Sequence, residues 1–127
     1  MRVDIQVYRT DHLTNEHVLL LETQGELEED CLYYPEDDEA THQVRFEEKR
    51  IVVKREAKDG ASHLVFIPEE IGSCEVTSSY GVLAFETKLN NCQKEDDRWE
   101  IEYEIWAENT CVSHVTMCWK FKSVALS

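Results

Sequence analysis

The sequence predicts an all-β fold, a single small antiparallel β-barrel of about 8–10 strands. Apolar and polar residues alternate at period two in many short runs, and turn residues separate these runs at intervals of roughly ten residues. No segment has a convincing helical period. With 127 residues, the chain has the length of one ordinary domain with a real core, so we expect one domain over residues 1–127. A two-sheet β-sandwich is the alternative fold.

The predicted strands, in chain order, cover residues 2–8, 17–27, 31–34, 43–46, 51–55, 63–67, 73–77, 82–89, 99–106 and 115–121. The first has one apolar face, formed by Val3, Ile5 and Val7. The second begins with the apolar run 18–21, which fits a helix or a strand, and its alternating continuation favours a strand. Gly25 within it indicates a bulge or a sharp bend, as at the corner of a barrel.

Turn residues mark the limits of the middle strands. Pro35 ends the third strand and an acidic loop follows it. Asp59-Gly60 is the strongest local turn signal, between the fifth and sixth strands. In the eighth strand, Leu83 and Phe85 share the inner face, and residues 90–97 are expected to form a polar loop.

The last two strands form the clearest hairpin. Their apolar residues all have odd numbers: Trp99, Ile101, Tyr103, Ile105, Val115, Met117, Trp119 and Phe121. The numbers of two residues that face each other across the hairpin therefore add up to an even number. The loop then holds an odd number of residues unless a bulge intervenes. We expect about three loop residues near 108–110, with Asn109 or a neighbour left-handed. The outward Glu100, Glu102 and Glu104 then face the polar side of the last strand, and we interpret them as solvated.

Composition and charge restrict the possible partners. Thirteen basic against 27 acidic residues give a formal charge of −14, which repels a nucleic-acid backbone. The N-terminal residues carry Asp4 and Gln6 where a signal peptide needs an apolar stretch, and no apolar run has the length of a membrane span. We expect a cytoplasmic protein that does not enter a membrane. Its five cysteines are odd in number and contain no Cys-x-x-Cys, so we expect reduced thiols.

The order of segments resembles the YwiB-like family of Gram-positive bacteria, a family of unknown function with a calycin-like, or lipocalin-like, β-barrel. The resemblance runs along nearly the whole chain and is carried by residues 22–27, by Leu32-Tyr33-Tyr34 followed by Glu36, by residues 77–83 and by the hairpin around Tyr103. These are turn and strand residues of a barrel. Ser79 stands where the family pattern has a proline, and Asn109 stands where it has a glycine. The resemblance implies the fold and no activity.

Catalytic and metal signatures are weak. Cys111 and His114 are three residues apart, which puts them on opposite faces of a strand, so we assign no metal site and no cofactor. The acidic run 36–39 lacks the spaced ligands and glycine of a calcium loop. No nucleophile elbow is present, and the abundant carboxylates carry no specific signal for glycoside hydrolysis. We therefore expect a protein that is not an enzyme and assign no catalytic residue.

The inner face of the barrel holds the remaining candidates. Its side chains either fill the barrel completely or leave a cavity for one small apolar or amphipathic ligand. We predict that Trp99, Tyr103, Trp119 and Phe121 contact such a ligand, with the phenols of Tyr33, Tyr34, Tyr80 and Tyr103 as polar contacts. This hypothesis expects a connected cavity of at least ~300 Å³. The alternative function is a protein-interaction module whose acidic outer face recruits a basic protein. The oligomeric state stays open.

Overall fold

The computed structural model describes residues 1–124 and folds them into strands alone. Residues 125–127 of the predicted domain lie outside the described part. The strands are β1 (Arg2–Asp11), β2 (Glu16–Glu28), β3 (Cys31–Pro35), β4 (Ala40–Phe46), β5 (Ile51–Ala57), β6 (Gly60–Phe66), β7 (Ile71–Ser78), β8 (Gly81–Lys94), β9 (Arg98–Ala107) and β10 (Thr110–Ser123). In this part of the chain, no helix is long and apolar enough to cross a membrane.

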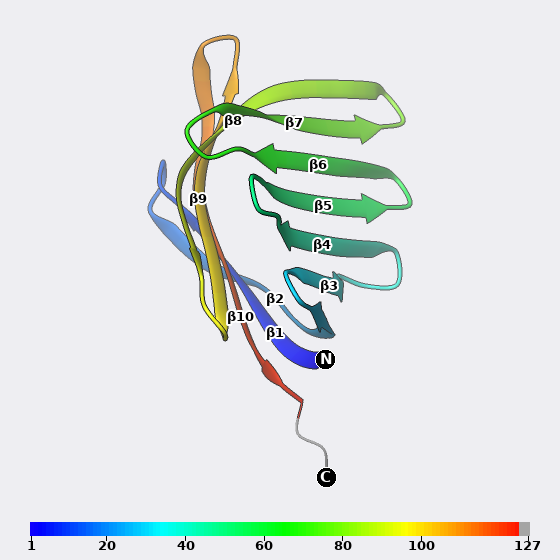
Figure 1. The fold of residues 1–127 in the computed structure, drawn as a ribbon. Coiled ribbons are helices and arrows are strands. Elements are labelled where there is room, and N and C mark those ends of the chain that lie inside the picture. The colour runs from blue at the N-terminus through cyan, green and yellow to red at the C-terminus, as the bar shows by residue number, and fades with distance from the viewer. Residues whose placement is uncertain (125–127) are drawn as a thin grey trace.

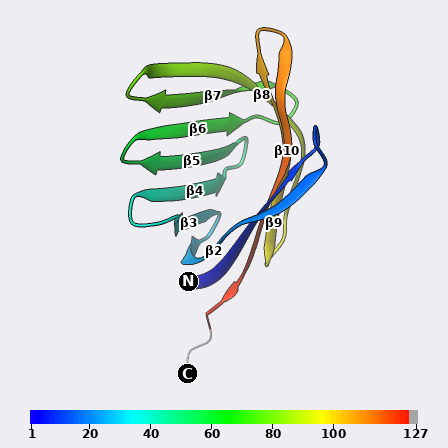
Figure 2. The ribbon, with the colours of Figure 1, turned by 180° about the vertical axis from the view of Figure 1, so that it is seen from behind.

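The strands form a closed antiparallel barrel in which each strand pairs with its neighbours in sequence, and β1 pairs with β10 to close the ring. This confirms the predicted barrel and excludes the two-sheet sandwich, because no edge remains between the first and last strands. The short strands β3–β7 stack along one side, and the long strands β1, β9 and β10 run across them on the other (Figures 1 and 2). Closure places the N-terminal strand beside the end of the described chain.

Strands β2 and β8 form the two corners where one side of the barrel passes into the other. Glu26 of β2 pairs with Arg2 of β1 and with Tyr33 of β3, so the strand changes partner at this point. The neighbouring Gly25 lies so close to β3 that a Cβ there would be 2.2 Å from the carbonyl oxygen of Tyr33. Only glycine fits at this close approach of β2 to β3, whereas the bulge of β2 lies at Leu20.

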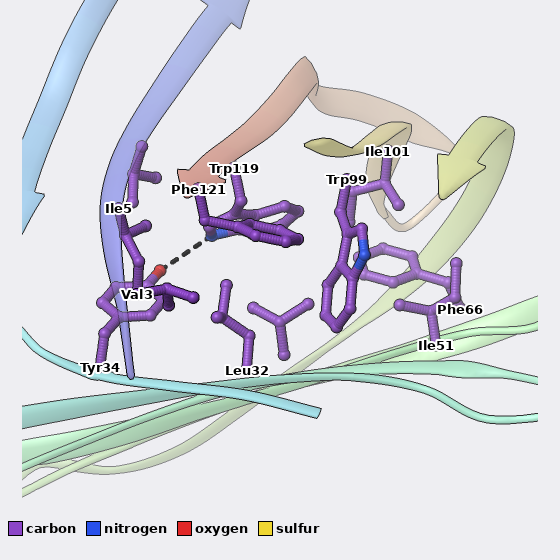
Figure 3. Close-up of a cluster of buried hydrophobic side chains, with 12 residues drawn as sticks. Val3, Ile5, Leu32, Tyr34, Ile51, Phe66, Trp99, Ile101, Trp119 and Phe121 are labelled. Carbon is purple, nitrogen blue, oxygen red and sulfur yellow. Dashed lines mark hydrogen bonds between the residues drawn. The ribbon is translucent and has the colours of Figure 1, made fainter. Parts of the chain in front are cut away.

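Large apolar side chains fill one end of the barrel (Figure 3). The indole of Trp99 is 2% exposed and packs against two phenylalanines, with ring centroids 5.0 Å from Phe46 and 5.5 Å from Phe121. Across the ladder of β4, β5 and β6, Phe46 pairs with Ile51 and Ile51 with Phe66, which forms one inward row. Burial of such side chains is the main stabilising contribution in a small domain, about 1.5–3 kcal/mol for each.

The hairpin of β9 and β10 has the predicted register and a different turn. Trp99 pairs with Trp119 and Tyr103 with Val115, so opposed residues sum to even numbers as expected. The expectation of about three loop residues is wrong: the turn has two, Glu108 and Asn109, with φ of 48° and 68°. This left-handed pair matches the twist of a hairpin. The extra residue that parity requires is the bulge at Val112.

Strand β8 also differs from expectation. It continues to Lys94, so most of the predicted polar loop 90–97 is strand, paired with β9 around a bulge at Asn90. Leu83, predicted on the inner face, pairs with Val76 but is 62% exposed. The β7–β8 hairpin extends beyond the packed part of the barrel at this end, which leaves its inward positions open to solvent.

Candidate functional site

The barrel contains a cavity of about 200 Å³, partly open to solvent, at the end opposite the aromatic cluster. Eight of the ten strands, all except β7 and β8, and the β3–β4 loop contribute to its wall. The lining residues are Val7, Leu20, Leu21, Tyr34, Glu36, His42, Val53, Arg55, Ser62, Leu64, Ile101, Tyr103, Met117 and Trp119. The wall is polar where β3, β4 and β5 contribute and mostly apolar elsewhere.

Strand periodicity explains how charged side chains enter the barrel. On β4, His42 lies two positions from the buried Val44, and on β5, Arg55 lies two positions from Val53. Residues two apart in a strand point to the same face, so both polar side chains must point inward. The ladder pairs His42 with Arg55 and Arg55 with Ser62, which forms a polar row across three strands.

Glu36, from the loop after β3, connects this row. Its two carboxylate oxygens accept hydrogen bonds from the Arg55 guanidinium, at 3.3 Å from Nε and 2.8 Å from Nη2. The same carboxylate lies 3.1 Å from His42 Nε2. The hydrogen bonds from Arg55 are the main reason that the pKa of Glu36 falls to about 2. Glu36 is therefore ionised across the physiological range, and Arg55 neutralises its charge.

His42 and Tyr34 continue the polar contacts into the core. Their rings stack with centroids 4.7 Å apart and 5° between planes. Burial lowers the pKa of His42, so the imidazole is neutral at pH 7 and donates from Nε2 to Glu36. The Tyr34 hydroxyl accepts a hydrogen bond from Trp119 Nε1 at 3.0 Å, drawn as the dashed line in Figure 3. Burial raises the pKa of Tyr34 to about 12, which keeps the phenol protonated.

A second arginine, Arg9, lies on the inward face of β1. Arg9 continues the series Val3, Ile5 and Val7, and pairs with the cavity residue Met117. Its Nε is buried and has no hydrogen-bond partner within residues 1–124. Burial raises the pKa of Tyr103 to about 12, and the charge of Arg9 opposes this rise slightly. This end of the barrel thus holds an unsatisfied polar donor, which is costly in a protein interior.

The structure brings together three of the residues predicted to bind a ligand. Tyr34, Tyr103 and Trp119 line the cavity. Trp99 and Phe121 are buried in the aromatic cluster and contribute packing.

Tyr33 and Tyr80 lie apart from the cavity. Tyr33 faces outward in a groove of about 530 Å³ over β2–β5, whose rim includes long exposed side chains such as Arg2, Gln24 and Glu56. Tyr80 occupies the β7–β8 turn and is 98% exposed. We place the candidate site inside the barrel because half-buried polar groups converge there beside buried apolar ones, whereas the outer groove is larger but formed mainly on a solvated surface.

Two aspects of the cavity differ from the sequence-based expectation. Its volume is below the ~300 Å³ expected, because Trp119 and Tyr103 occupy part of the interior. Its polar groups are also more numerous, since Glu36, His42 and Arg55 line it and were not among the predicted site residues. A signal for His42 and Arg55 was present, because each continues the inward parity of an apolar strand. No periodicity indicated that Glu36 points inward, since a loop has no fixed period, and the family resemblance that includes Glu36 implied only the fold.

The cavity side chains that could coordinate a metal ion already pair with other side chains of the cavity, as Glu36 forms an ion pair with Arg55. The described side chains that could converge on a metal ion lie on the outer face instead, at His12, Glu102 and His114. Sequence reasoning considered His114 only with Cys111 and missed His12 and Glu102. The predicted closure of the barrel could have indicated this group, because closure brings the end of β1 beside β10, which pairs with β9.

Comparisons with known proteins identify a matching family and a similar solved structure. A model of the family described as a domain of unknown function, DUF1934, matches residues 3–118. The crystal structure of the ywiB protein from Bacillus subtilis is similar, with a TM-score of 0.60 and 14% sequence identity, over 96% of this chain and 91% of that chain. Curated protein sequences gave no match. At this identity the structural likeness establishes the barrel fold alone.

Proposed function

Since the chain belongs to the DUF1934 family, a domain of unknown function, we propose a function from the geometry of its barrel. The function is non-enzymatic binding of one small amphipathic molecule in the internal cavity. Its apolar part packs against Ile101, Leu64 and Met117, and its polar part faces the row formed by His42 and Arg55.

The observation that carries this proposal is the division of the cavity wall into an apolar and a polar part. A folded chain gains no stability from leaving a charged row beside unfilled space when apolar side chains could fill it. Ligand pockets have this composition, mostly apolar with a few convergent polar groups. Binding fits better than catalysis, because Glu36 and Arg55 neutralise each other and His42 donates to Glu36.

The volume restricts the size of the ligand. A cavity of about 200 Å³ equals the liquid volume of about seven water molecules at ~30 Å³ each. A ligand of this size is a single ring or a short chain with one polar group.

A cytoplasmic location belongs to the same proposal. The five cysteines carry free thiols, and Cys92 is exposed. Exposed free thiols are typical of proteins in reducing compartments. Recruitment of a basic protein by the acidic outer face stays a prediction.

The two methionines of the chain provide a test. Met117 lines the cavity, whereas Met1 is exposed at the N-terminus. The protein labelled with ¹³C at its methionine methyl groups is titrated separately with indole, p-cresol and hexanoate, and followed by NMR. We expect at least one probe to shift the Met117 signal to saturation while the Met1 signal stays in place. The absence of a Met117 shift with all three probes contradicts the proposal.

A pair of adjacent substitutions locates the binding. Val53→Phe adds a ring that points into the cavity, whereas Lys54→Phe adds the same ring on the outer face. We expect Val53→Phe to abolish the saturable Met117 shift and Lys54→Phe to retain it. Equal binding by both variants places the probe outside the barrel. Circular dichroism checks that both variants are folded.

A further inference from the structure

Two histidines and a glutamate lie together on the outer face of the barrel, away from the cavity. His114 Nε2 is 2.8 Å from Glu102 Oε2, and the rings of His12 and His114 have centroids 4.5 Å apart. One ligand atom of each of His12, Glu102 and His114 lies within 4.8 Å of the other two. Glu102 and His114 are half-buried and His12 is exposed, so the group is accessible to an ion.

The barrel topology fixes these side chains from three separate segments. Glu102 comes from β9, His114 from β10, and His12 from the turn that follows β1. The backbone N–H of His12 donates to the carbonyl oxygen of His114 at 2.8 Å, which holds the turn against β10. His12 Nε2 also lies 2.7 Å from the hydroxyl of Thr116. A hydrogen bond at one ring nitrogen is the usual means of orienting a metal-binding histidine.

The bulge in β8 supplies an independent observation. Asn90 is the residue left unpaired between Leu89 and Asn91, and its side-chain amide lies over the same group. Its Nδ2 is 3.5 Å from Glu102 Oε2 and 3.4 Å from His114 Nε2. Bulges of this kind redirect a side chain and are common beside functional sites. Three strands, β8, β9 and β10, and the β1–β2 turn therefore contribute polar groups to one small area.

We propose that His12, Glu102 and His114 bind a divalent transition-metal ion of the zinc type. Two imidazoles and one carboxylate form a ligand set typical of an open zinc site, in which water completes the coordination. Imidazole ligands favour zinc, cobalt, nickel or copper over calcium and magnesium, which prefer oxygen ligands. The ion joins the β1–β2 turn to β9 and β10, across the seam where the barrel closes.

Cobalt(II) is the probe for the test, because its visible absorption reports coordination geometry and its near-ultraviolet absorption reports thiolate ligands. The full chain, freed of metal with a chelator, is titrated with Co²⁺ and then with Zn²⁺ in competition. We expect one Co²⁺ per chain, visible bands of nitrogen and oxygen coordination, no thiolate band, and displacement by Zn²⁺. Zn²⁺ also raises the Tm, since it binds the folded chain preferentially.

Three variants decide whether these residues are the ligands. His12→Ala and Glu102→Gln each lower the affinity by more than about 100-fold, beyond the effect of losing an outer hydrogen-bond partner. His63→Ala, at an exposed histidine on β6, leaves the affinity unchanged. Retained binding in His12→Ala, a thiolate band, or the absence of saturable binding by the wild-type chain overturns the proposal. Circular dichroism of each metal-free variant shows that its barrel is intact.

Discussion

The two ends of the barrel interior are built on the same strands and differ in what occupies the inward positions. Along the ladder of β4, β5 and β6, the first inward row is Phe46, Ile51 and Phe66. The second row is Val44, Val53 and Leu64, and the third is His42, Arg55 and Ser62. The interior therefore changes from mainly aromatic, through aliphatic, to polar with one permanent charge within three rows. The filled end packs around Trp99, and the charged end borders the cavity.

This difference shows that alternation and composition control separate properties. Alternation sets which residues point inward, and it holds at both ends. The types of the inward side chains determine whether they fill the barrel interior, and these types change along the barrel axis. The filled end stabilises the fold through apolar burial, while the charged end lowers stability through desolvated polar groups such as Arg9. Stability therefore explains the filled end, and the charged end requires another reason, for which we propose ligand binding.

The largest effect is expected from removing the centre of the filled end. Trp99→Ala deletes a fully buried indole in contact with Phe46 and Phe121 and should lower the free energy of unfolding by about 3–5 kcal/mol. Met117→Ala, on the cavity wall, should cost about 2 kcal/mol, because that side chain is only partly buried. Urea denaturation measures both values. Equal losses would contradict the division of the interior into a packed and an open end.

An intermediate effect is expected at Tyr34, where the two ends meet. Tyr34→Phe removes the acceptor of the Trp119 Nε1–H bond and leaves that donor buried without a partner, at a cost of about 1–3 kcal/mol. Tyr33→Phe is the matched control on the outer face and should change stability by less than about 0.5 kcal/mol. Urea denaturation followed by tryptophan fluorescence compares the two variants. A loss at Tyr33 as large as that at Tyr34 would be inconsistent with the observed orientation.

Much of the fold was predictable because strand period and turn chemistry are local. The inward positions of β1, β9 and β10 follow from short segments, and the structure confirms them. The predicted turn between β5 and β6 is present one residue earlier than expected, at Lys58 and Asp59, because Gly60 already pairs with Ala57. The two-residue turn at Glu108 and Asn109 was not predictable by parity alone. A bulge at Val112 has the same effect on register as a third loop residue, so the sequence is consistent with both.

The candidate site was predictable only in part, because it depends on contacts between distant segments. The aromatic contributions of Tyr34, Tyr103 and Trp119 follow from inward parity. The pairing of Glu36 with Arg55 joins a loop to a strand 19 residues away, and no local pattern encodes it. The outer group of His12, Glu102 and His114 requires the closure of β1 onto β10, a contact between residues about 100 positions apart.

The smallest effect concerns the charged row and depends on pH. Glu36→Gln removes the ion pair with Arg55, and since both side chains are more than a third exposed, solvent screening limits the loss at pH 7 to about 1 kcal/mol. The pKa of Glu36 falls from 4.5 to about 2 in the folded chain. A carboxyl group whose pKa is lower in the folded than in the unfolded chain stabilises the fold fully when the pH is above its unfolded-state pKa. This stabilisation is lost as the pH falls through the folded-state pKa.

The difference between wild type and Glu36→Gln should therefore be constant above about pH 4.5 and vanish towards pH 2. Urea denaturation at a series of pH values measures it, with Asp38→Asn as the control, an exposed neighbour that forms no ion pair in the described part of the chain. Asp38→Asn should show a smaller difference. If Glu36→Gln is still less stable than wild type at pH 2, the Glu36 side chain stabilises the fold through packing and not through its charge. The charged end of the barrel would then resemble the filled end in how it contributes to stability.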